Sequence, residues 1–356
     1  MSSLSAFPEK TGLFYQLSIE TVAMILGCLD NIGSLVPTLL ASSRFMDAFE
    51  TVPGIAEKII QRQVHPHLLP LAIAIIDARH GKYKHREEVA KLGHDIWAEP
   101  EQFTDRLNPH HLDQTANHGD VLSTRSLIHI GYYYTFIGKV VDYYALHAWR
   151  IAGAYDAVNL SETERVRFYR AFYLLELYIL VSKRYAEDGG FIESPAHEFL
   201  RALPPWEWEQ MACAQRYLLS WVILSGYHEL KVDESTHNRD INATVWGSQG
   251  LGLLMKFDKA DSVEAKKNLL ARAWMGKCIF LQDDMVDAFE YRYLAHPWGT
   301  MGQEGFQIDI PDRGPYEDED TGPLETWITA HVCPTCKDWW IGWEGAIVLV
   351  SLAYVF

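Results

Sequence analysis

Basic residues are scarce in this sequence of 356 residues. It has 31 Lys and Arg against 47 Asp and Glu, which gives a formal net charge of −16. That balance excludes a protein that coats nucleic acid through general positive charge. Cysteine is also rare, and the five cysteines are scattered and odd in number. They do not form the framework of a disulfide-rich secreted domain, so we expect a reducing, cytoplasmic setting.

Long apolar runs are missing as well. The cleanest ones, residues 68–76 and 346–356, are much shorter than the roughly 20 residues that a helix needs to cross a bilayer. Residues 1–10 lack the basic and then apolar pattern of a secretory signal. We therefore expect no transmembrane anchor and no membrane partner.

Several catalytic loop motifs are absent from the sequence. It contains no Gly-x-Gly-x-x-Gly or Walker loop and no Gly-x-Ser-x-Gly elbow, which argues against nucleotide-cofactor enzymes and against hydrolases of that type. No internal repeat of the kind that recruits substrates in many adaptor proteins is evident. We expect no cofactor.

Strand signals are nearly absent, whereas helical periodicity runs through most of the chain. The hydrophobic fraction of 48% supplies a large core. The sequence therefore predicts a compact, mostly α-helical protein with short helices at its N-terminus and longer ones beyond. The longer helices are expected at residues 123–150, 165–185, 204–230 and 262–294, and a long connection or partly helical insertion is expected over residues 87–120.

Local signals place some of these helices. Ser161 and Glu164 have the Ser-x-x-Glu spacing of a capping box, which predicts a helix start there. Near the N-terminus, apolar residues at helical spacing predict two short amphipathic helices with buried apolar faces. The first face comprises Leu17, Val22, Ile25, Leu26 and Leu29, and the second comprises Leu35, Leu39 and Leu40.

The segments 17–29 and 34–46 resemble an F-box, the small helical module that docks onto the Skp adaptor of cullin ubiquitin ligases. The resemblance rests on the spacing of apolar residues, and the usual Leu-Pro opening of the module is Leu17-Ser18 here. It implies an F-box-like helical segment over residues 1–65, followed by an α-helical catalytic or binding body over residues 66–356. A Skp-type adaptor is the partner that this resemblance implies.

Much of the remaining chain, including residues 161–173, 199–218 and 322–331, is similar to fungal proteins with F-box-like N-termini. A related group, the arginine-containing cyclodipeptide synthases, has an Asp-Asp-x-x-Glu motif, and the nearest element here is Asp283-Asp-Met-Val-Asp287. This resemblance implies an aminoacyltransferase of secondary metabolism that joins arginine and a second amino acid, both from aminoacyl-tRNAs, into a diketopiperazine. The alternative is an F-box substrate adaptor without catalytic activity.

Four acidic residues form the candidate catalytic site of such an enzyme. Their spacing would place them on one side of a helix. Three interpretations stay open: a solvated acidic face, a general base or clamp for a cationic substrate, and a divalent-metal site. The Asp-Asp-x-x-Asp pattern also occurs in the metal-binding signature of terpene synthases, but the second half of that signature is not found near residues 238–248 of this chain. We therefore assign no metal ligands. The four residues are Asp283, Asp284, Asp287 and Glu290.

A basic run precedes these carboxylates and is the candidate tRNA-binding surface, since phosphate contacts need only a local cationic patch. Phe257 and Trp274 lie within the run and could stack on unpaired bases. The alternative is a solvated lysine face. The basic run consists of Lys256, Lys259, Lys266, Lys267, Arg272 and Lys277. A second basic cluster, with the same two interpretations, consists of Arg79, Lys82, Lys84, His85, Arg86 and Lys91.

Two sets of metal-ligating residue types are incomplete. Cys333 and Cys336 have zinc-knuckle spacing and His331 is near them, but no second pair follows. A zinc site would need a distant residue such as His296 to complete it. The three histidines of residues 110–118 lack the i, i+4 spacing of helical metal ligands, so we interpret them as surface polar residues.

Overall fold

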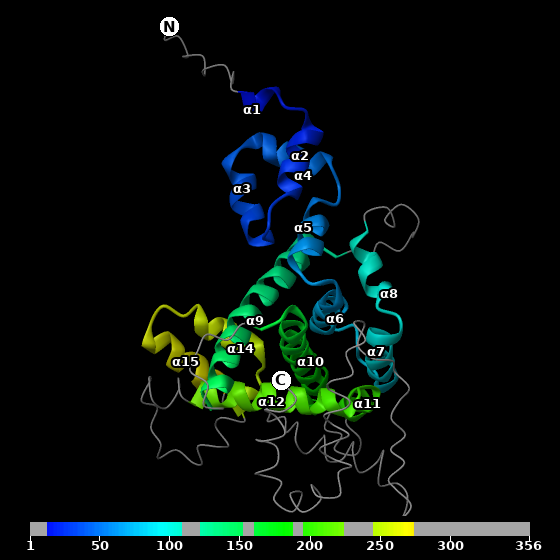
Figure 1. The fold of residues 1–356 in the computed structure, drawn as a ribbon, viewed down its shortest axis with the longest axis vertical. Coiled ribbons are helices and arrows are strands. Elements are labelled where there is room, and N and C mark those ends of the chain that lie inside the picture. The colour runs from blue at the N-terminus through cyan, green and yellow to red at the C-terminus, as the bar shows by residue number, and fades with distance from the viewer. Residues whose placement is uncertain (1–12, 109–121, 152–159, 188–194, 224–244, 274–356) are drawn as a thin grey trace, which may run out of the picture. The chain divides into compact units, whose positions relative to one another are not determined.

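The computed structural model describes residues 13–108, 122–151, 160–187, 195–223 and 245–273. These residues form helices joined by turns, and no β-strand occurs among them (Figure 1). The mostly α-helical fold class is therefore confirmed. None of the helices in this part of the chain is both long and apolar enough to cross a membrane. Contacts between residues divide the chain into two compact units, which we call unit 1 (Met1–Leu69 and Glu101–Thr135) and unit 2 (Pro70–Pro100 and Phe136–Phe356).

Unit 1 contains mostly short helices. Ser18 and Ser42 begin two of them, because their side-chain oxygens accept the backbone N–H groups of Thr21 and Arg44, each at 3.2 Å. Helix α4 packs against α2 and α3, and α5 packs against α2. The elements are α1 (Leu13–Gln16), α2 (Ile19–Gly27), η1 (Ile32–Ser34), α3 (Leu35–Ala41), α4 (Ser43–Thr51), α5 (Ile55–Gln63), η2 (Pro66–Leu68), α8 (Glu101–Thr104), η3 (Asp105–Leu107) and the first part of α9 (Thr124–Ile151).

The predicted apolar faces of the first two helices are only partly buried. Val22, Leu26 and Leu35 are completely buried, as expected for core residues. Ile25 and Leu40 are exposed instead, so the apolar face of each helix extends beyond the part that is buried. The apolar stripe on each helix is wider than the surface that unit 1 covers by its own packing.

The side chain of Gln63 holds the N-terminal helices against α9 within unit 1. Its Oε1 atom accepts the backbone N–H of Ile32 at 2.9 Å, while its Nε2 donates to the Gly131 carbonyl at 3.1 Å and to Thr135 Oγ1 at 3.2 Å. The two segments approach closely at Gly131, where a Cβ atom would overlap Ile32 Cγ2 and lie 2.9 Å from Gln63 Oε1. Glycine is required there because no side chain fits.

We expect Gly131→Ala to lower the free energy of unfolding of unit 1 by about 1–3 kcal/mol, the usual cost of forcing an extra methyl group into packed atoms. Gly27→Ala is the matched control. A Cβ atom at Gly27 meets nothing within 4 Å, and alanine favours the helix, so this variant should be as stable as the wild type or slightly more stable. Urea denaturation of both variants measures the difference. Equal losses would contradict the close approach at Gly131.

Unit 2 is built from longer helices. Helix α10 is its central helix, since residues 171–179 are buried all around the helix axis. It packs against α11 and α12, while α7 packs against α11 and α14 against α15. The elements are α6 (Leu69–His80, from Pro70 on), α7 (Arg86–Ala98), the remainder of α9, α10 (Glu162–Glu187), α11 (Pro195–Ala202), α12 (Pro205–Ile223), α14 (Leu251–Asp258) and α15 (Val263–Ala273).

Several predicted helices are confirmed in unit 2. The Ser161–Glu164 capping box is formed, because Ser161 Oγ accepts the Glu164 N–H at 3.2 Å and the Glu164 carboxylate accepts the Ser161 N–H at 2.7 Å. Residues 87–120, predicted as a long connection or partly helical insertion, are helical in their first part, where α7 is regular. The Glu88 carboxylate accepts the backbone N–H groups of Lys84 and His85, which starts that helix. Only residues 263–273 of the helix predicted over 262–294 are described.

Candidate functional site

Many of the residues singled out from the sequence lie outside the described part of the chain. These include the whole candidate catalytic set, the last lysine of the basic run and all residues of the incomplete metal sets. Among the residues that the structure describes, no group of three or more His, Cys, Asp and Glu side chains could hold a metal ion. The predicted residues outside the described ranges are Asp283, Asp284, Asp287, Glu290, Lys277, Trp274, Cys333, Cys336, His331, His296, His110, His111 and His118.

The most prominent feature of unit 1 is a set of exposed large apolar side chains. Seven such side chains are exposed in the described residues, and four of them fall between residues 24 and 40. They are Met24 (71% exposed) and Ile25 (45%) on α2, and Val36 (45%) and Leu40 (76%) on α3. We call these four residues the exposed apolar set. Val36 and Leu40 are one turn apart and share one side of α3.

A groove runs along α2 beside α5 in unit 1, with a volume of about 490 Å³. Its apolar lining comes from Ala23, Met24, Val52 and Ile55, and its cationic lining comes from Lys58 and Arg62. The Arg62 guanidinium donates to the Leu29 carbonyl at 2.8 Å and also to the Gly27 carbonyl, so it satisfies the last carbonyl of α2 and one carbonyl just beyond the helix. The volume is in the range of sites that bind small molecules or short peptide segments.

The described part of the basic run lies on α14, on the turn after it and on α15. The exposed residues are Lys256, Lys259 and Arg272, whereas Lys266 and Lys267 are half-buried. Neither Lys256, Lys267 nor Arg272 forms an ion pair with any described residue. Three acidic residues lie among these five cations, and one of them, Asp258, is 3.9 Å from Lys139. A net positive surface therefore remains on a chain of charge −16.

The structure gives Phe257 a different role from the one expected. The Lys266 ammonium lies 5.0 Å from the centre of the Phe257 ring, which is a cation–π contact between α14 and α15. The ring is half-buried. Phe257 thus contacts a lysine of the basic run within unit 2, and that lysine covers one face of its ring.

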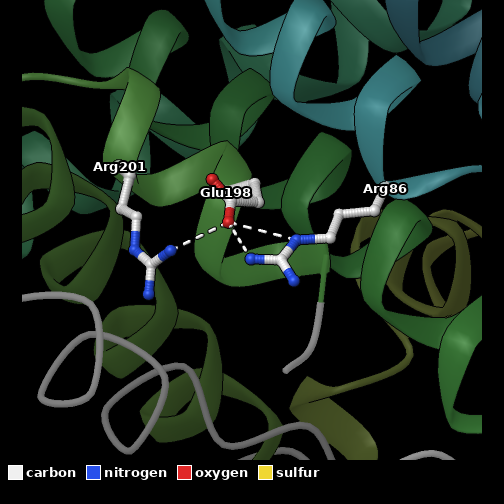
Figure 2. Close-up of polar contacts among 3 residues, drawn as sticks. All are labelled: Arg86, Glu198 and Arg201. Carbon is white, nitrogen blue, oxygen red and sulfur yellow. Dashed lines mark hydrogen bonds and ion pairs between the residues drawn. The ribbon is translucent and has the colours of Figure 1, made fainter. Parts of the chain in front are cut away.

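The second basic cluster is largely neutralised by carboxylates of unit 2. Arg79 pairs with Glu176 at 3.0 Å, Lys82 with Asp77 at 3.2 Å and Lys91 with Asp95 at 3.9 Å. Figure 2 shows Glu198 between two guanidinium groups: Arg86 Nε donates to Glu198 Oε1 at 3.1 Å, and Arg201 Nη1 donates to the same oxygen at 2.8 Å. This cluster ties α6 and α7 to their neighbours and is a poorer phosphate-binding surface than the basic run. The other residues of the cluster, Lys84 and His85, are exposed.

A buried charged group joins three segments of unit 2. Glu176 on α10 is 2% exposed and ion-pairs with Arg79 through Oε1, while its Oε2 accepts the backbone N–H of Leu251 at 2.6 Å. Burial raises the pKa of Glu176, against the opposing effect of the Arg79 charge. Nearby, Lys183 donates to Gln249 Oε1 at 3.2 Å, and burial lowers the pKa of that lysine. The carboxylate caps the first turn of α14 and so helps to fix the helix that begins the basic run.

Gly250 makes this contact with Glu176 possible. Its φ angle is +71°, and a Cβ atom there would overlap Glu176 Oε2. Neither Glu176 nor Gly250 is among the residues predicted from the sequence to be functional. One signal was available, because Glu176 is the only charged residue in the otherwise apolar or uncharged stretch of residues 171–179, and a lone charge in a buried helix needs a partner.

Comparison with known proteins leaves the chain without an identified relative. No protein-family model matches it. Neither a curated protein nor a solved structure matches it.

Proposed function

We propose that this chain is an adaptor protein that docks onto a Skp-type partner through its N-terminal helices, as an F-box does. The observation that carries the proposal is the exposed apolar set, Met24, Ile25, Val36 and Leu40. Exposed apolar side chains gathered on one small helical module are typical of a protein interaction site. In this proposal, unit 2 holds or presents the substrate that the adaptor recruits.

The energetics of the exposed apolar set support docking. Burying one large aliphatic side chain that was fully exposed contributes about 1.5–3 kcal/mol, so two or three anchors supply much of the energy of a stable complex. Leu40 and Met24, which are 76% and 71% exposed, have the most surface to lose and are the expected anchors. Unit 1 is also pre-organised by the Gln63 hydrogen bonds, which reduces the entropy lost on binding.

The test is co-expression with a Skp-type adaptor of a fungal cullin ligase, followed by affinity purification and size-exclusion chromatography. We expect an equimolar complex that survives dilution into the micromolar range. A folded chain that elutes alone, with no adaptor retained, would contradict the proposal.

We keep a second candidate function, a tRNA-dependent cyclodipeptide synthase, because of the basic run on α14 and α15. In this reaction the α-amine of one aminoacyl-tRNA attacks the ester carbon of another, and the tRNA of the attacked ester leaves as an alcohol. The free amine of the dipeptidyl ester then attacks the remaining ester carbon, which closes the ring and releases the other tRNA. The ester is already activated, so the scheme needs no nucleotide cofactor. Asp283, Asp284, Asp287 and Glu290 would supply the general base or the clamp for the arginine side chain, and cationic side chains would hold the tRNA phosphates.

The tRNA part of this second candidate predicts a specific salt dependence. The logarithm of tRNA affinity should fall linearly with the logarithm of salt concentration, and Lys267→Ala should reduce the slope by roughly 0.7–0.9, the contribution of one phosphate contact. Lys91→Ala is the matched control. Because Lys91 is paired with Asp95, this variant should leave the slope unchanged. Fluorescence titrations at several salt concentrations measure both slopes. Undetectable binding at low salt would remove tRNA as a partner.

The two candidate functions are separated by product analysis. Expression in a heterologous host followed by mass spectrometry should reveal an arginine-containing diketopiperazine only if the chain is a synthase. A medium identical to the empty-vector control, together with a stable Skp complex, supports the adaptor alone.

A further inference from the structure

The groove between α2 and α5 has a chemical character of its own. Its floor is apolar, and one flank carries Lys58, which is exposed and forms no ion pair with any described residue. Arg62 lies one turn further along α5 and is occupied by carbonyls at the end of α2. The N–H groups of Arg62 that face α2 are thus engaged by carbonyls, which leaves Lys58, among the described residues, as the cation of the groove that is available to pair with a carboxylate of a ligand.

The shape of the groove fits an extended segment. Its lining extends along α2 from Glu20 to Gly27, which corresponds to about 10 Å at 1.5 Å per helical residue. An extended chain covers that length with about three residues. At Gly27 the groove is open, since a Cβ atom there would meet nothing within 4 Å. Glu20 is exposed at the other end, and hydrogen bonds from its own backbone N–H and from Ser18 lower its pKa, so it is ionised.

We propose that this groove binds a short peptide segment of a partner protein, with two or more apolar side chains on the floor and a carboxylate beside Lys58. The apolar floor supplies affinity through buried surface, and Lys58 selects a carboxylate over an ammonium. Glu20 repels the carboxylate of the segment, so it keeps that group away from its own end of the groove. The proposal goes beyond Skp docking: of the exposed apolar set only Met24 lines the groove, whereas Ile25, Val36 and Leu40 do not.

Cys28 allows a direct test, because it is an exposed free cysteine in the groove lining. The full chain is equilibrated, under a fixed concentration of a thiol reductant, with disulfide-activated peptides that begin with cysteine. The first continues with two leucines and an aspartate, the second with two leucines and a lysine, and the third with two serines and an aspartate. Peptide mapping by mass spectrometry then gives the fraction of Cys28 that carries each peptide.

We expect the leucine–aspartate peptide to be captured at Cys28 about tenfold more strongly than the serine–aspartate peptide, as burial of about one leucine side chain implies. It should also be captured more strongly than the leucine–lysine peptide, because Lys58 attracts a carboxylate and repels an ammonium. Equal capture of the three peptides would overturn the proposal. Full competition by octanoate would also overturn it, because the occupant would then be a small apolar acid rather than a peptide.

Two variants sharpen the result. Lys58→Glu should reverse the preference between the aspartate and lysine peptides, and Gly27→Met should fill the open end of the groove and abolish selective capture without a steric cost to the fold. Arg125→Glu is the matched control, since it makes the same charge change on α9 in unit 1 but outside the groove. An unchanged preference in Lys58→Glu, or the same change in Arg125→Glu, would contradict the role of Lys58.

Discussion

Val36→Asp and Leu40→Asp are each expected to weaken binding of a Skp-type adaptor at least about a hundredfold. Both side chains are exposed in unit 1, so the free chain gains little from their packing and should fold normally. In a complex the new carboxylate would be buried against apolar surface without a partner, which costs several kcal/mol. Each 1.4 kcal/mol corresponds to a factor of ten in affinity.

The measurement is isothermal titration of the purified variants with the adaptor, after circular dichroism has shown that their helix content is unchanged. Val263→Asp is the matched control. Val263 is also exposed, at 57%, but it lies on α15 in unit 2, so this variant should bind like the wild type. Wild-type affinity in both Val36→Asp and Leu40→Asp would remove the exposed apolar set as the docking surface.

The positions of the longer helices could be predicted from local sequence, because local forces decide them. The Ser161–Glu164 box acts within one turn of a helix, and the helix start that it predicts is confirmed. The helix predicted from residue 204 begins at Pro205. Helix α7 was predicted only as part of a long connection or partly helical insertion, because its start relies on Glu88 and on an uncommon capping residue, His85, in a polar stretch. The buried side of α7, with Val89, Leu92 and Ile96, is narrow. A sequence with so few apolar residues is easily interpreted as a loop.

Burial on the N-terminal helices could not be predicted in the same way. Leu39 and Leu40 are adjacent leucines in α3, and one is buried while the other is exposed. Periodicity identifies an apolar stripe but does not say whether the chain itself or a partner covers each part of it. The exposed apolar set is therefore a property of the tertiary structure.

The net charge of the two candidate phosphate-binding surfaces also could not be predicted from the sequence alone. Both basic clusters are equally plausible phosphate sites in the sequence. Carboxylates distant in sequence decide between them, since Glu176 and Glu198 neutralise much of the second cluster and the basic run keeps Lys267 and Arg272 unpaired among the described residues. These ion pairs cannot be predicted from local sequence, because their two residues are far apart in the chain and come together only when the helices pack.

Glu176→Ala is expected to lower the free energy of unfolding by about 2–4 kcal/mol, which combines a buried N–H group left without an acceptor and a small cavity. The N–H is that of Leu251, which donates to Glu176 Oε2 at 2.6 Å. Glu87→Ala is the matched control, because Glu87 is exposed on α7 and such substitutions usually change stability by less than about 0.5 kcal/mol. Urea denaturation followed by circular dichroism measures both. Equal losses of unfolding free energy in the two variants would contradict the role of Glu176 in holding α14 against α10.

Glu176→Gln tests the charge of the same side chain. Burial raises the pKa of Glu176 above its ordinary value of 4.5, so the folded chain holds this proton more tightly than the unfolded chain does. The stability that Glu176 contributes is then fully present below pH 4.5 and is lost as the pH rises through the raised pKa. As the pH rises through the raised pKa, the unfolding free energy of the wild type should therefore fall relative to that of Glu176→Gln. This holds whichever of the two proteins is more stable at low pH. Measurements from pH 4 to pH 8 give this profile, and parallel curves for the two proteins would mean that Arg79 and the Leu251 N–H fully offset the cost of burying the carboxylate.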